Sequence, residues 1–105
     1  MLGFINMKPR LLIIEDDPSL NEMLSLHFED QGYQVAGALS CAEGLEHLRA
    51  HAVDLVLLDQ QLPDDTRMEL LKTLMSDYPD QVMLMLIGEH VLKLVIDAIE
   101  AGASD

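Results

Sequence analysis

The sequence has 105 residues, half of them hydrophobic, a length that suits one small domain rather than two. No uncharged run of membrane-spanning length is present, so we expect no membrane association. Nineteen acids against six bases give a net charge of −13, which argues against direct binding of nucleic acid. The single cysteine, Cys41, cannot form an internal disulfide and the sequence has no zinc framework, which favours a cytoplasmic location.

The first half of the chain alternates between strand and helix patterns. Residues 1–8 are expected to be a disordered leader. A buried strand is predicted at 10–14, and it ends in three acids and Pro18. A helix is predicted at 18–32, where Gly32 supplies the stop, and a second strand follows at 33–39.

The second half repeats this alternation. Ser40 and Glu43 form a capping-box pattern at the start of a helix predicted at 41–52. The remaining expected elements are a third strand at 54–59, a helix at 68–78, a fourth strand at 81–88 and a helix at 90–101. Four strand-and-helix alternations with short connections imply right-handed crossovers, a parallel sheet and helices on both of its faces.

Acidic side chains follow the first and third predicted strands. Glu15, Asp16 and Asp17 close the first strand, and Asp59 closes the third. If those strands are neighbours, about 4.8 Å apart, their carboxylates meet at the ligand-binding end of the sheet. Such a cluster suits Mg²⁺ and would allow one carboxylate to attack phosphorus. Acids after strands also serve as helix caps and turn formers, and spacing alone does not choose between the two interpretations.

Three motifs resemble one known family. The segments "RLLIIEDDPSL", "DLVLLDQQLP" and "AIEAGASD", in this order and at these separations, are similar to the receiver domain of bacterial two-component response regulators. The resemblance runs from about Arg10 to Asp105 and is nearest to receivers of transcriptional activators of the nitrogen-regulator type. It implies a flavodoxin-like α/β fold, a doubly wound parallel sheet with strand order 2-1-3-4-5.

The resemblance also implies a function and a set of site residues. Asp59 matches the family's phosphoacceptor, which receives a phosphoryl group from a sensor histidine kinase in a reaction that needs Mg²⁺ as cofactor. Asp16 matches the direct metal ligand, Glu15 a ligand that acts through water, and the backbone carbonyl of Gln61 the third protein ligand. An output domain in the full-length protein is the other expected partner.

The sequence departs from the family pattern in three places. The loop after the acceptor reads "PDDTR" at 63–67, where the family usually carries glycines. Ile87 stands where a Thr or Ser normally hydrogen-bonds the phosphoryl group, and an isoleucine has no donor. The sequence ends at Asp105, where the family continues into a fifth strand bearing a Lys and a fifth helix. We therefore expect residues 9–105 to form one receiver domain, incomplete at its C-terminus, with strand order 2-1-3-4.

Two other functions fit parts of the sequence. A degenerate or truncated receiver would act without phosphorylation, through protein contacts or a homodimer made by the apolar helix at 90–101 and the exposed edge of the fourth strand. A haloacid-dehalogenase-type phosphatase would need a second Asp two residues after Asp59, where Gln61 stands. We expect no conventional enzyme, although a receiver catalyses its own phosphorylation and dephosphorylation.

Two smaller features are expected to be structural. His47 and His51 have the i, i+4 spacing of a metal-binding pair, but "HLRAH" offers no third ligand and indicates a solvated helix face. Cys41 at a helix start has the position of a reactive thiol, and packing of a small side chain is the preferred interpretation.

Overall fold

The computed structural model describes residues 8–59, 62, 67–86 and 97. Its elements are, in chain order, β1 (Arg10–Ile14), α1 (Pro18–Asp30), β2 (Gln34–Ala38), α2 (Cys41–Ala50), β3 (Leu55–Asp59), α3 (Arg67–Asp77) and β4 (Val82–Leu86). The first seven predicted elements are confirmed in type and order, with ends that agree to within two residues. The predicted leader, apart from Lys8, and the predicted helix at 90–101, apart from the helical Asp97, lie outside the described residues.

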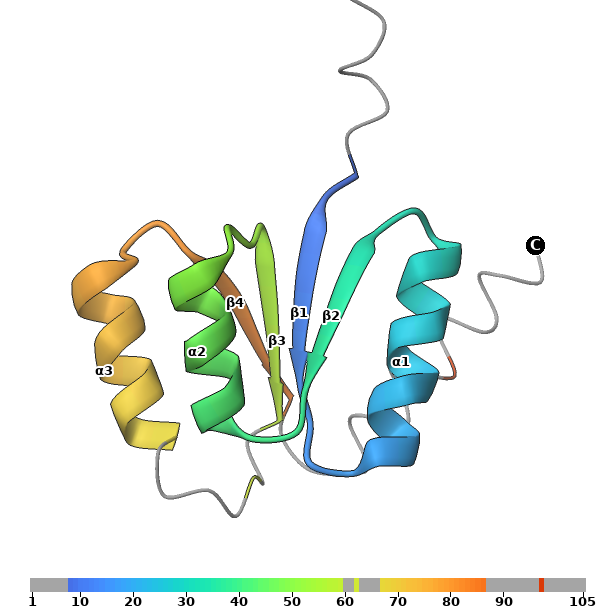
Figure 1. The fold of residues 1–105 in the computed structure, drawn as a ribbon, viewed down its shortest axis with the longest axis horizontal. Helices are drawn as coiled ribbons and strands as arrows, with labels where there is room; N and C mark the ends of the chain where they lie inside the picture. The colour runs from blue at the N-terminus through green and yellow to red at the C-terminus, as the bar shows by residue number, and fades with distance from the viewer. Residues whose placement is uncertain (1–7, 60–61, 63–66, 87–96, 98–105) are drawn as a thin grey trace, which may run out of the picture.

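The four strands form one parallel sheet with the order β2-β1-β3-β4 (Figure 1). In register, Ile14 lies opposite Ala38 of β2 and Leu58 of β3, and Asp59 lies opposite Leu86 of β4. The predicted order 2-1-3-4 is therefore confirmed. Because β1 is central and pairs with both β2 and β3, the acids that follow β1 lie beside the end of β3.

Helices cover both faces of the sheet, α1 on one side and α2 with α3 on the other (Figure 1). Successive side chains of a strand point to opposite faces, so every second residue of β1 packs on the same layer. Leu12 and Ile14 belong to the core beneath α2 and α3, whereas Leu11 and Ile13 pack with Leu24 of α1. This two-sided burial explains why the strands are continuous apolar runs. In the part of the chain that is described, no helix has both the length and the apolar character needed to cross a membrane.

The outer strand β4 exposes part of its apolar surface. Val82 and Leu84 are 58% and 53% exposed, and they lie opposite Leu55 and Leu57 on the α1 face of the sheet. The predicted self-association through this edge stays a prediction.

The helix termini follow the capping signals of the sequence. Ser40 Oγ accepts a hydrogen bond from Glu43 N, which confirms the predicted cap of α2, while Glu43 Oε2 accepts one from Leu39 N. Helix α1 ends at Asp30, and Gly32 follows with φ of +97°, a conformation that glycine adopts without strain. Glycine is thus required just after α1, as its sequence position predicts.

Helix α2 approaches the sheet closely at Gly44. A Cβ added at Gly44 would overlap Cδ1 of Ile14 and lie 2.9 Å from its Cγ1. Ile14 is fully buried beneath α2, so it has little room to move aside.

We predict that Gly44→Ala destabilises the domain even though alanine favours helices. Overpacking costs about 1–3 kcal/mol and the gain in helix propensity is about 1 kcal/mol, so urea unfolding should show a net loss of up to about 2 kcal/mol. Repeating the substitution in an Ile14→Val background, which removes Cδ1, should reduce the loss. A gain in stability from Gly44→Ala alone would contradict this packing argument.

Candidate functional site

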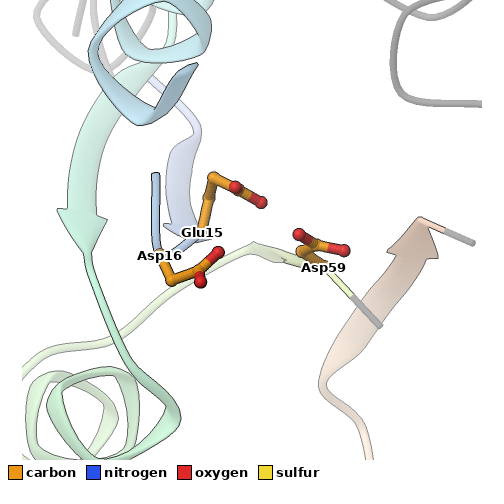
Figure 2. Close-up of side chains that lie close together, drawn as sticks. All are labelled: Glu15, Asp16 and Asp59. Atoms are coloured by element: carbon orange, nitrogen blue, oxygen red, sulfur yellow. The ribbon is translucent and has the colours of Figure 1, made fainter. Parts of the chain in front are cut away.

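Three carboxylates converge where β1 and β3 end. Glu15 and Asp16 follow directly after β1, and Asp59 is the last residue of β3. One oxygen from each of the three side chains lies within 4.8 Å of the other two. Figure 2 shows these carboxylates turned toward a common space. The parallel pairing of β1 with β3 brings together residues that are more than forty positions apart in the sequence.

Glu15 is the buried member of this carboxylate cluster. Its side chain is only 4% exposed, with Oε1 accepting a hydrogen bond from Asp17 N at 3.2 Å. The other oxygen, Oε2, is buried and accepts no hydrogen bond from the part of the chain that the structure describes. The pKa of Glu15 is raised to about 8, mainly because the side chain is buried and secondly because it shares a hydrogen bond with Asp59. The negative charges of Asp59 and Asp16 add to the shift. A proton on Glu15 therefore relieves the repulsion in the metal-free protein.

The cluster also has the chemistry of a magnesium site. Hard oxygen ligands with partial exposure, as at Asp16 and Asp59, suit Mg²⁺, which retains several waters. A cation with its bound waters would offer a donor to Glu15 Oε2, which accepts no hydrogen bond from the described residues, and its charge would neutralise the like charges. The residues present therefore fit a divalent cation.

The structure divides the predicted acids between two roles. Asp17 lies outside the cluster and caps α1: its Oδ1 accepts from Ser19 N at 3.0 Å and from Leu20 N at 3.3 Å. The cap interpretation is therefore confirmed for Asp17, and the other three acids form the cluster that the metal interpretation requires. The predicted ligand Gln61 and the predicted switch position Ile87 lie outside the described residues.

Sequence reasoning missed a buried polar residue behind the cluster, Asn21 of α1. Its side chain is 5% exposed, and its amide nitrogen donates to the backbone oxygens of Glu15 and Ala38. The sequence does contain a sign of its burial: Asn21 lies three residues before the buried Leu24, on the face of α1 where the apolar stripe predicts a hydrophobic side chain.

The remaining candidates behave as structural residues. His47 is partly buried and its ring stacks on that of His51, with the ring centroids 4.5 Å apart. Burial and then the neighbouring His51 lower the pKa of His47. Cys41 is fully buried at the start of α2, as the packing interpretation predicts. Within the described residues, the only group of three or more potential ligands is the carboxylate cluster.

Comparison with known proteins identifies the family and places this geometry within it. The family model of the response regulator receiver domain matches residues 11–105. Among curated relatives, the transcriptional activator protein PfeR of Pseudomonas aeruginosa is 44% identical over 77 residues, which are 73% of this chain and 25% of PfeR. The transcriptional regulatory protein AfsQ1 of Streptomyces coelicolor is 33% identical over 92% of this chain and 43% of its own length. The chain thus spans less than half the length of either relative.

The solved structures agree with the sequence matches. The non-phosphorylated HemR receiver domain from Leptospira biflexa is 35% identical with a TM-score of 0.71, over 78% of this chain and 66% of that one. The resemblance noted from the sequence motifs is thereby confirmed by a family model, by relatives and by fold. The chain belongs to the family of response regulator receiver domains.

Proposed function

We propose that the domain accepts a phosphoryl group on Asp59 from a histidine kinase, in a reaction that depends on Mg²⁺. The observation that carries the proposal is the carboxylate cluster, in which oxygens of Glu15, Asp16 and Asp59 lie within 4.8 Å of one another. Among the described residues, none donates a hydrogen bond to Glu15 Oε2. Asp59 is the only one of the three that belongs to a strand, β3, so its carboxylate has a fixed position from which to attack phosphorus.

Each acid has a separate role in this proposal. An oxygen of Asp59 attacks phosphorus, the bond from phosphorus to the kinase imidazole nitrogen breaks, and its electron pair stays on the imidazole. Asp16 holds the cation together with Asp59, and the buried Glu15 contributes through a water. Bound Mg²⁺ would neutralise charge on the phosphoryl oxygens. The receiver would thus promote its own modification without being a conventional enzyme.

Two further residues belong to the proposal by resemblance. The backbone carbonyl of Gln61 would be the third protein ligand of the cation. Ile87 would occupy the position of the switch hydroxyl, where it can give no hydrogen bond to a phosphoryl group. Reporting of phosphorylation in this chain would then depend on groups other than a side-chain hydroxyl at that position.

The partners we propose are a sensor histidine kinase and an output domain that regulates transcription, in the cytoplasm. PfeR and AfsQ1 are named as transcriptional regulators, and this chain matches only 25% and 43% of their lengths. With a net charge of −13, the receiver itself is not expected to contact nucleic acid. A homodimer through β4 or through residues 90–101 remains a prediction.

We predict that acetyl phosphate, a small phosphoryl donor, adds one phosphoryl group to the chain when Mg²⁺ is present and none when EDTA removes it. Intact-protein mass spectrometry would detect the group, and peptide mapping would locate it at Asp59. The variant Asp59→Asn should abolish the modification because an amide oxygen is a far weaker nucleophile than a carboxylate.

The matched control is Asp54→Asn, which changes the aspartate just before the amino end of the same strand, β3. It should leave the modification unchanged. Modification that survives in Asp59→Asn, or that is equally strong in EDTA, would count against the proposed acceptor chemistry.

We predict that the contribution of Glu15 to the stability of the metal-free domain decreases as the pH rises from about 4.5 to about 8. In this range the folded state keeps the Glu15 proton, whose pKa is raised to about 8, while the unfolded state with its ordinary pKa of 4.5 has lost it. The folded state then binds more protons, so its stability declines with pH by no more than about 1.4 kcal/mol per unit.

Urea unfolding in EDTA at several pH values would measure this effect as the difference between wild type and Glu15→Gln. The glutamine variant should gain stability relative to wild type as the pH rises from about 4.5 to about 8, and the difference should level off at higher pH. Glu29→Gln, on the exposed surface of α1, is the control and should show a constant difference over the same range. A constant difference for Glu15→Gln as well would mean that burial does not retain the proton.

A further inference from the structure

Asn21 links the carboxyl ends of two strands from within α1. Its amide nitrogen Nδ2 donates to Ala38 O at 2.9 Å and to Glu15 O at 3.0 Å, with a longer contact of 3.5 Å to Ile13 O. Ala38 O also accepts from Glu15 N at 3.0 Å. The buried side chain of Asn21 thus holds the backbone of Glu15, the first acid of the carboxylate cluster, against the end of β2.

The Asn21 amide is itself held in one orientation. Its oxygen Oδ1 accepts a hydrogen bond from Ser25 Oγ, one turn later in α1, at 3.4 Å. With the oxygen on that side, both hydrogens of Nδ2 face the strand carbonyls. The side chain is 5% exposed, so water does not readily replace these bonds.

The space for this amide exists because β2 has a glycine at position 37. A Cβ at Gly37 would overlap Asn21 Oδ1 and lie 3.3 Å from its Cγ. Gly37 lies opposite Ile13 in the sheet, on the face covered by α1. Its backbone does not need the positive φ that glycine allows, since the only positive-φ glycine described is Gly32. The glycine is therefore explained by the close approach of Asn21.

We propose that Asn21 is a positioning residue for the metal-binding turn, and that Gly37 is required because it leaves room for the Asn21 amide. Asn21 touches none of the three carboxylate groups. It acts through the backbone of Glu15, so that the carboxylates of Glu15 and Asp16 are held opposite Asp59. This inference rests on the proposed function only in assigning Mg²⁺ as the ion that the turn receives.

If position 21 served only to pack α1 on the sheet, an asparagine would not be expected there. Leu24, one turn along α1, contributes an apolar side chain to this face, and an apolar residue at position 21 would bury area equally well. An amide is needed there because the carbonyl oxygen of Glu15 lies beyond the last strand residue and needs a donor. Residues that orient metal ligands without binding the metal themselves commonly change the metal affinity 10–100-fold when they are removed.

The test measures two properties of Asn21→Ala, of Gly37→Ala and of wild type. The first is the Mg²⁺ dissociation constant, followed by NMR titration of the Glu15 and Asp16 amide signals with MgCl₂. The second is the hydrogen-exchange rate of the Glu15 amide in metal-free protein, because this amide donates to Ala38 O. Each single variant should raise the dissociation constant by about tenfold or more and should speed the exchange of this amide.

Leu74→Ala is the control for a general loss of stability. Leu74 is a buried residue of α3, in the core on the opposite face of the sheet. This variant should be destabilised in urea unfolding but should keep the wild-type Mg²⁺ affinity and the wild-type exchange rate of the Glu15 amide relative to its global unfolding.

The double variant decides whether the two residues act as a pair. In the Asn21→Ala background, the Gly37 position faces the space left by the amide, so adding Gly37→Ala should weaken Mg²⁺ binding no further. Effects that multiply in the double variant would overturn the pairing of Asn21 with Gly37.

The outcomes separate this inference from the proposed function. Wild-type affinity in Asn21→Ala, or a loss equal to that in Leu74→Ala, would overturn the positioning role while leaving the receiver chemistry intact. If wild type binds no Mg²⁺, the proposed function fails, and the exchange rate of the Glu15 amide still decides whether Asn21 orders the turn.

Discussion

The carboxylates of Glu15, Asp16 and Asp59 can share one small volume only while a proton or a cation lies among them. Their oxygens lie within 4.8 Å of one another, and one buried oxygen of Glu15 has no donor within residues 8–59, 62, 67–86 and 97. Burial strengthens the repulsion because fewer waters screen it. In the metal-free protein the raised pKa of Glu15 keeps a proton among the carboxylates, and a divalent cation would take the place of that proton when it binds. The chemistry of the site follows from this constraint.

The rest of the fold prevents the repulsion from being relieved by movement. β1 is buried on both faces and pairs with two strands, so the acids at its end cannot move away from Asp59 without disturbing the core. Asp17 anchors the turn to the start of α1, and Asn21 joins the turn to β2. The carboxylates are therefore held together in an arrangement that suits a cation, as expected for a preorganised site.

The sequence was sufficient for much of this description because the relevant signals are local. Apolar runs and caps located seven elements, and the ends of two strands located Glu15, Asp16 and Asp59. Asn21 and Gly37 were missed because their role depends on a contact between α1 and β2 that no periodicity reveals. Gly44 was missed for the same reason, since its need arises from Ile14 on another element. The separate role of Asp17 as a cap required the hydrogen bonds themselves.

The same constraint couples metal binding to the stability of the domain. A ligand that binds only the folded state stabilises it by an amount that grows with the logarithm of its concentration. Here the cation would also remove a repulsion that the folded state already contains, and it would compete with the proton on Glu15. Metal affinity should therefore increase with pH over the range in which metal-free stability declines. In the proposed phosphoryl transfer, the acidic turn would already be ordered before the phosphoryl group binds, so its ordering would not add to the cost of the reaction.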